Sequence, residues 1–233
     1  MNQKDWAIAW QKHLTGYLSG EPRTGIFIKY LTKKIKSSLE LGCGSGRDSI
    51  YLSKKGVSAI ATDYEPVVIG TLQEKFKDLD VKFCVADALN LAFPDKSFDL
   101  VFHNGLFVLF GDDEIFTMLK EQERVSRKYI LILVHNKENQ KLINSFAEKA
   151  PDDPVFNIRF FYRDDIDSLV EQSGIKYKRK TYYKFGGKAD ILNYKILRFL
   201  PNILYPFRKW WTPRLYQFQP WEKTERIGCL LEI

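Results

Sequence analysis

Along the first 135 positions, short runs of apolar residues alternate with longer segments in which apolar and polar residues are mixed in an amphipathic pattern. The apolar runs predict strands over residues 37–42, 57–62, 81–85, 98–103 and 129–135. Apolar residues three or four positions apart predict helices over residues 4–18, 25–36, 46–55, 65–77 and 112–125. This alternation predicts an α/β fold, with a largely parallel sheet covered by helices on both faces.

The pattern changes after residue 135. Helices are predicted over residues 138–149 and 164–173, and Gly174 ends the second of them. Strands are predicted over residues 176–185 and 226–233. The segment between them is too long for a hairpin loop. We therefore expect a helical insertion before the last strand.

The size and composition of the chain predict a soluble globular protein. Its 233 residues, 45% of them hydrophobic and 28% charged, suit one α/β domain with a sizeable core. The three cysteines show no metal-type pairing and are too few for a disulfide framework, which favours a cytoplasmic location and predicts no metal site. The sequence shows no signal peptide and no apolar run of about 18 residues, so no membrane-spanning helix is expected.

The positive charge is concentrated in one region. The chain has a net charge of +7, but residues 176–214 contain eleven basic residues and one acid, Asp190. That region therefore carries +10 and the rest of the chain −3. Any anionic partner is expected to contact this region.

Three alternating glycines, Gly42, Gly44 and Gly46, join the first of these strands to the helix that follows it. Glycines in such a turn let the backbone approach a ligand closely, and the helix start offers free N–H groups. A dinucleotide fingerprint would need its third glycine at position 47, which is arginine, and no phosphate-binding P-loop is present. The turn therefore predicts a nucleotide-like cofactor without a pyrophosphate.

The stretch Glu40-Leu-Gly42-Cys-Gly44-Ser-Gly46 resembles the motif of the class I S-adenosylmethionine-dependent methyltransferases. Further signals follow in the family's order: Asp63 at the end of the second strand, Ala86-Asp87-Ala88 after the third, and residues 93–101 leading into the fourth. The resemblance covers residues 37–185 and the last strand. It implies a three-layer Rossmann-like sandwich, with a mostly parallel seven-stranded sheet whose last strand is antiparallel, and S-adenosylmethionine as cofactor.

The resemblance also implies a set of cofactor-binding residues: Glu40, Gly42, Gly44, Gly46, Asp63, Tyr64, Asp87, Ala88 and Asn104. The glycines would admit the methionine portion, and Glu40 would help to hold its ammonium group. Asp63 would accept hydrogen bonds from the ribose hydroxyls, and Asp87 would accept one from the adenine amino group. Asp63 could instead cap the next helix, and Asp87 could be a plain turn residue.

A general base is needed only if the methyl acceptor must lose a proton, since the cofactor supplies the reactivity. His103, at the carboxyl end of the fourth strand, is the candidate catalytic residue because its ordinary pKa suits proton removal. The alternative is a packed, hydrogen-bonded histidine within the strand. His135 is a second candidate, and His13 could face the site only if the N-terminal helix folds over it.

The acceptor is less well specified than the cofactor. The fourth strand is followed by Asn104-Gly105-Leu106, rather than the Asn/Asp-Pro-Pro-Tyr/Phe of many enzymes that methylate bases or glutamine. Residues 46–52 with Lys55-Gly56 look like small-molecule methyltransferases of the thiopurine and tellurite-resistance type. We therefore expect methyl transfer to a small or amphiphilic metabolite at oxygen. An RNA methyltransferase and a non-catalytic S-adenosylmethionine-binding regulatory protein remain alternatives.

The insertion over residues 186–225 is basic and aromatic. Thirteen of the 34 aromatic residues of the chain lie within residues 177–221, and residues 191–204 predict a basic amphipathic helix. The segment could form a cap over the site, contact an anionic membrane surface through residues 188–214, or bind nucleic acid, the last being least favoured. The location is then cytoplasmic or peripheral at a membrane.

We expect one methyltransferase domain over residues 1–233. Within it, residues 1–36 are predicted to form an N-terminal helical lid and residues 186–225 the cap. Residues 37–185 and 226–233 are predicted to form the cofactor-binding core. The sequence gives no oligomeric state.

Overall fold

The computed structural model describes residues 12–14, 16–32, 34–191 and 205–233. Its strands are β1 (Ser37–Leu41), β2 (Ser58–Asp63), β3 (Val81–Val85), β4 (Phe98–Asn104), β5 (Ser126–His135), β6 (Arg179–Phe185) and β7 (Arg226–Glu232). Its longer helices are α2 (Arg23–Leu31), α3 (Arg47–Ser53), α4 (Pro66–Lys75), α5 (Asp112–Val125), α6 (Gln140–Lys149), α7 (Arg163–Ser173) and α9 (Tyr205–Phe218). Shorter helical segments are η1 (Leu106–Leu109), η2 (Pro154–Phe156), α8 (Lys188–Ile191) and η6 (Trp221–Lys223).

The seven strands form one sheet in the order β3-β2-β1-β4-β5-β7-β6. β7 runs antiparallel to both of its neighbours, and β1 to β5 pair in parallel. This confirms the predicted α/β fold, including its antiparallel last strand. β1 lies between β2 and β4, so the direction in which successive strands are added reverses at β1. A crevice therefore opens at the carboxyl end of β1, where such folds bind ligands.

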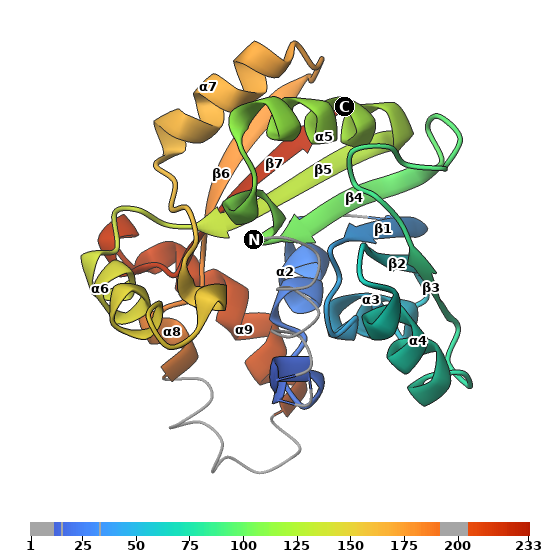
Figure 1. The fold of residues 1–233 in the computed structure, drawn as a ribbon, viewed down its shortest axis with the longest axis horizontal. Helices are drawn as coiled ribbons and strands as arrows, with labels where there is room; N and C mark the ends of the chain where they lie inside the picture. Colours follow the sequence, from blue (N-terminus) through green and yellow to red (C-terminus); the bar gives the residue numbers. More distant parts are fainter. Residues whose placement is uncertain (1–11, 15, 33, 192–204) are drawn as a thin grey trace.

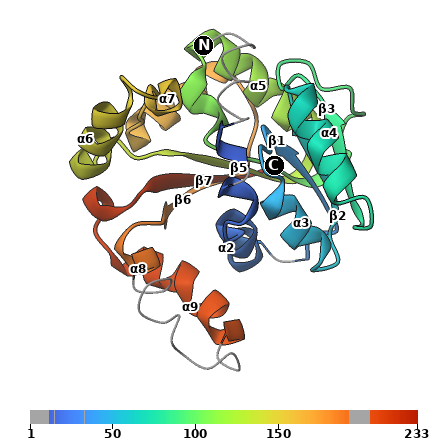
Figure 2. The same cartoon turned by 60° about the horizontal axis from the view of Figure 1, so that its bottom comes forward.

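Helices cover both faces of the sheet, giving three layers (Figure 1). α5 and α7 pack on one face through Ile115, Met118 and Leu169, which are buried against β5 and β7. α2, α3 and α9 lie against the other face (Figure 2), where Phe27, Leu52 and Tyr216 form a second cluster. The central strand β4 and the second half of β5 are buried on both sides, as strands of a doubly covered sheet are.

Local sequence explains where several elements begin and end. The Glu65 side chain accepts a hydrogen bond from the Val67 N–H at 3.3 Å, and Pro66 begins α4 at a position where no N–H is needed. α7 ends at Gly174, whose φ of 72° is the left-handed conformation predicted for that stop. α2 is shorter than predicted, because the backbone is already extended at Thr32.

Two of the predicted helices lie partly or largely outside the described residues. Residues 12–14 and 16–18 are helical, as predicted for the end of the first helix, and residues 1–11 lie outside the described residues. The amphipathic helix predicted over residues 191–204 falls almost entirely on residues 192–204, which also lie outside them. Within the described residues, no helix has the length and apolar character needed to cross a membrane.

Candidate functional site

The glycine turn lies between β1 and α3, at the carboxyl edge of the sheet. It is closed by hydrogen bonds from the Cys43 N–H to the Thr62 carbonyl at 2.8 Å and from the Gly46 N–H to the Cys43 carbonyl at 2.9 Å. Gly42 has a φ of 60°, and a Cβ there would lie 2.9 Å from Cδ1 of Leu106. A side chain at that φ would be strained, and its Cβ would also displace the end of the Leu106 side chain.

Gly46 lies deeper in the fold than the other residues of the turn. Gly42, Cys43, Gly44 and Ser45 line the cavity described below, but Gly46 does not. A Cβ on Gly46 would lie 2.7 Å from Cε1 of Phe83, in the core beneath the turn. The missing side chain therefore lets α3 start close to the sheet.

Glu40 lies beneath the turn and is almost fully buried. Its Oε2 accepts hydrogen bonds from the Ser49 hydroxyl at 2.6 Å and from the Ser49 N–H at 3.2 Å. Burial, together with the nearby charge of Asp48, raises the pKa of Glu40 to about 8. A cationic group arriving here would favour the ionised form of this carboxyl.

Asp63, the last residue of β2, supports the turn from the other side. Its Oδ2 accepts a hydrogen bond from the Gly44 N–H at 2.9 Å, and its Oδ1 accepts one from the Glu65 N–H at 3.1 Å. The Tyr64 N–H also interacts with this carboxylate, which has about four acceptor sites and so can still accept a hydrogen bond from a ligand. Burial raises the pKa of Asp63, against these hydrogen bonds.

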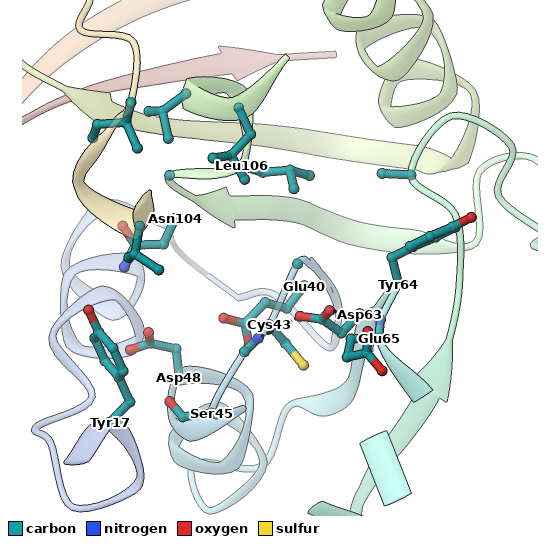
Figure 3. Close-up of a pocket in the computed structure, with 18 of the residues that line it drawn as sticks. Tyr17, Glu40, Cys43, Ser45, Asp48, Asp63, Tyr64, Glu65, Asn104 and Leu106 are labelled. Atoms are coloured by element: carbon teal, nitrogen blue, oxygen red, sulfur yellow. Dashed lines mark hydrogen bonds between the residues drawn. The ribbon is translucent and has the colours of Figure 1, made fainter. Parts of the chain in front are cut away.

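The strand ends beside Asp63 complete this part of the site. Tyr64 is 56% exposed, and Figure 3 shows it at one end of the cavity, beyond the carboxylates of Asp63 and Glu65. Asp87, after β3, accepts a hydrogen bond from the Leu89 N–H at 2.9 Å and lines the cavity with Ala88. The structure thus brings Asp63, Tyr64 and Asp87 to one edge. The sequence reading missed Glu65, although its place before Pro66 marks a helix cap.

Residues 42–45 of the turn line one cavity of about 580 Å³ together with Glu40, Asp63, Tyr64, Glu65 and Asp87. That volume falls within the range of about 300–1,000 Å³ for small-molecule sites. From the glycine turn the cavity continues past the ends of β4 and β5 to an apolar region. This apolar region is lined by Leu109, Phe110, Phe146, Val155, Phe156 and Ile158. A polar, acidic end is therefore continuous with an apolar, aromatic end.

Asn104 and His103 are neighbours in β4 but point to opposite faces, as successive strand residues do. Asn104 lines the cavity, and its Nδ2 donates to the Thr24 hydroxyl at 2.9 Å. His103 is fully buried on the α5 face, with its ring 4.1 Å from that of Phe107. Burial, with a smaller effect of Arg226, lowers the pKa of His103 to about 3.

His103 therefore cannot take a proton from a molecule in the cavity, and we withdraw it as the candidate base. The structure corrects the sequence reading because the strand alternation puts position 104, not 103, on the cavity side. The structure agrees with the packing of the alternative but not with its hydrogen bonds, because neither ring nitrogen of His103 has a partner among the described residues.

The other two histidines do reach the cavity. His135 ends β5, and its ring lies 5.2 Å from that of Phe146 in α6. Burial and the charge of Arg226 hold the pKa of His135 well below its usual range. His13 lines the cavity from the N-terminal segment, where its Nε2 lies 2.7 Å from Oδ2 of Asp153.

A network of buried charges lies where α2, α8 and β7 meet. Arg23 forms ion pairs with Asp190 and, at 2.8 Å, with Glu225, and the Tyr216 hydroxyl donates to Asp190 at 2.6 Å. Glu225 lies 3.4 Å from the Nε of Arg226. Burial would raise the pKa of Glu225, but Arg23 and Arg226 hold it at about 2.

Arg23, Glu225 and Arg226 line the cavity, and sequence reasoning missed all three. The signal was available for Arg226, which is a charged residue opening an otherwise apolar strand. Its neighbours in the sheet register are His135 on β5 and Phe185 on β6.

Apart from Glu225, the described part of the 186–225 insertion does not line this cavity. Tyr216 of α9 lies against Phe27 and Phe185, with ring centroids 6.1 and 5.3 Å apart. Among the described residues of 186–224, none lines the cavity. The described walls over the apolar end come instead from the N-terminal segment and residues 146–158.

Comparisons with known proteins agree with this fold. Residues 39–128 match the family model described as a methyltransferase domain. The chain is 30% identical over 127 residues to norajmaline N-methyltransferase of Rauvolfia serpentina, covering 52% of this chain and 43% of the relative. The chain spans less than half the length of the curated relatives that it matches.

Solved structures resemble the chain over nearly its whole length. A TehB-like S-adenosylmethionine-dependent methyltransferase from Corynebacterium glutamicum has a TM-score of 0.59 at 16% identity, over 98% of this chain and 96% of that one. Phosphoethanolamine N-methyltransferase 2 of Haemonchus contortus, solved with S-adenosyl-L-methionine, has a TM-score of 0.61 at 15% identity, over 90% of this chain and 51% of that one. Residues 39–128 are therefore similar to a methyltransferase domain, and the chain shares the fold of these solved methyltransferase structures.

Proposed function

We propose that this chain transfers a methyl group from S-adenosylmethionine to a small molecule with an apolar or aromatic body. The observation that carries the proposal is the single cavity that joins the acidic glycine turn to the aromatic pocket. A donor at the turn and an acceptor among the aromatic side chains would then lie next to each other. Holding the two reactants in contact is the main contribution that a protein makes to such a transfer.

The residues at the acidic end suit S-adenosylmethionine. The free lone pairs of Asp63 suit the ribose hydroxyls, and the exposed carboxylate of Asp87 suits an amino group of the adenine. Glu40 would hold the ammonium group, and Oδ1 of Asn104, which has no hydrogen-bond partner among the described residues, faces the same space. When bound, the cofactor supplies an activated methyl group on a positively charged sulfur.

The aromatic end suits an organic acceptor rather than a nucleic acid. α6 is amphipathic, yet none of its residues is fully buried, because its apolar face borders open cavity space at Phe146. Oxygen stays the predicted acceptor atom, with His135 in place of His103 as the group that takes up a proton. His135 lines the cavity, and its Nδ1 has no hydrogen-bond partner among the described residues, which supports this role.

Contact with an anionic membrane surface also remains a proposal. On α9, Trp210 and Trp211 are about half exposed and Phe218 is almost fully exposed. Tryptophans beside basic residues are typical of segments that lie at a membrane interface. Sedimentation with anionic vesicles should therefore retain the wild-type protein and lose the Trp210→Ser, Trp211→Ser variant. Equal sedimentation of the two proteins would remove this surface from the account.

The experiment that tests the proposed activity uses methyl-labelled S-adenosylmethionine and cell extracts separated into small-molecule, lipid and RNA fractions. Label should enter the small-molecule or lipid fraction and depend on the protein. Label in RNA would establish the RNA methyltransferase instead. Binding of the cofactor without transfer to any fraction would favour the regulatory protein.

A further inference from the structure

Besides Oδ1 of Asn104, three buried polar atoms in the walls of the cavity have no hydrogen-bond partner among the described residues. They are Nη1 of Arg226, Nε of Arg23 and Nδ1 of His135. Buried polar groups in folded proteins almost always have partners, and each exception calls for an explanation such as a ligand. All three residues line the cavity, so one bound molecule can reach them.

Arg226 occupies the central position of this group. A Cβ on Gly105 would lie 2.9 Å from Nη1 of Arg226 and 3.9 Å from Cε1 of His135. The guanidinium therefore lies directly against the backbone at the end of β4, beside the His135 ring. Gly105 has a φ of 90°, and its lack of a side chain leaves room for this approach.

The charges around Arg226 leave a positive surplus on the cavity side. Glu225 lies closer to Arg23, at 2.8 Å, than to Arg226, at 3.4 Å. The second acid of the network, Asp190, is held by Arg23 and by the Tyr216 hydroxyl and does not line the cavity. Two guanidinium groups and one carboxylate of this network thus face the ligand space.

The aromatic pocket begins at the same place. The His135 ring packs against Phe146, and the Phe146 ring lies 5.2 Å from that of Phe156. A molecule with its apolar body between these rings would reach His135 first and then Arg226.

We propose that Arg226, with Arg23 beside it, forms an oxyanion subsite that selects acceptors carrying a carboxylate on an apolar or aromatic body. The subsite belongs to the methyl acceptor and so rests on the proposed function. Arginine donates to a carboxylate through fixed, parallel N–H groups, which gives the acceptor one orientation. Neutralising Arg226 would also relieve its effect on the neighbouring His135 ring, whose pKa it now lowers.

The test compares two probes of one shape, 3-phenylpropanoate and 3-phenylpropan-1-ol, by calorimetry in the presence of saturating S-adenosylhomocysteine. Wild type should bind the carboxylate at least about tenfold more tightly than the alcohol, a difference of about 1.4 kcal/mol. Arg226→Gln should bring the two affinities to within about twofold. Arg226→Lys, which keeps the charge, should retain part of the preference.

Controls separate the subsite from general effects. Arg179→Gln removes an exposed positive charge at the start of β6, where Arg179 pairs with Glu232 of β7. Arg226 lies beside the opposite end of β6, so this change should leave the preference unchanged. Binding of S-adenosylhomocysteine reports whether each variant is folded, and if Arg226→Gln does not fold, the Lys variant still has to keep a weakened preference. Equal binding of the two probes by wild type, no binding of the carboxylate, or an unchanged preference in both Arg226 variants would overturn the proposal. The two probes are also compared without S-adenosylhomocysteine. Failure of wild type to bind S-adenosylhomocysteine would therefore overturn the proposed function, while the preference between the probes still tests the subsite.

Discussion

Gly46→Ala tests whether the third glycine of the turn serves packing rather than ligand contact. Alanine at a φ of 62° costs about 1–2 kcal/mol, because its Cβ crowds the backbone in the left-handed conformation. The new Cβ would also lie 2.7 Å from Phe83 and 3.3 Å from Leu72, and overpacking of this kind costs about 1–3 kcal/mol. We therefore expect a loss of about 2–5 kcal/mol in the free energy of unfolding.

Gly56→Ala is the matched control. Gly56 has a similar φ of 77°, but a Cβ there would have no atom within 4 Å, so only the backbone penalty of about 1–2 kcal/mol applies. Urea unfolding followed by tryptophan fluorescence measures both variants, and calorimetry measures the Kd for S-adenosylhomocysteine. Gly46→Ala should be the less stable variant by about 1–3 kcal/mol and, while folded, should keep its Kd within about threefold. Equal stability losses, or normal stability with lost affinity, would refute the packing role.

Three further substitutions have expected outcomes. Glu40→Gln should flatten the pH dependence of stability. In wild type the folded state, with a Glu40 pKa of about 8, holds a proton that the unfolded state releases near pH 4.5, so the free energy of unfolding falls as pH rises between these values. Urea titrations across that window measure the slope for both proteins. His103→Leu removes two buried ring nitrogens that have no partners among the described residues, so the free energy of unfolding should stay level or rise by up to about 2 kcal/mol. Methyl transfer should persist. Loss of transfer at unchanged cofactor affinity would restore His103 as a base. Asp63→Asn should lower the free energy of unfolding by about 1–3 kcal/mol, because an amide N–H₂ would face the Gly44 or Glu65 N–H. It should also raise the Kd for S-adenosylhomocysteine at least about tenfold. An unchanged Kd would exclude the ribose contact.

The order of strands and helices could be read from the sequence, because the core strands are apolar and the helices periodic. The turn at residues 42–46 and Asp63 lie at strand ends, and parallel strands bring their carboxyl ends to one edge. For this reason the sequence could predict the edge at which the cofactor-binding residues meet.

The acceptor side was much harder to predict. Arg226 and Arg23 are about 200 positions apart in the sequence and meet only because β7 inserts between β5 and β6. His103 was misjudged because a one-residue shift along a strand changes the face on which a side chain lies. No local pattern in the sequence reports which of two adjacent residues faces a cavity when both faces of the sheet are covered.

The central claim is that the acidic glycine turn holds the adenosyl group of S-adenosylmethionine. Calorimetric titration of the wild-type chain with S-adenosylhomocysteine, with NADH as the competing ligand class, tests it most directly. We predict saturable one-to-one binding of S-adenosylhomocysteine and no heat of binding with NADH. Binding of NADH without binding of S-adenosylhomocysteine, or no binding of either, would contradict the account.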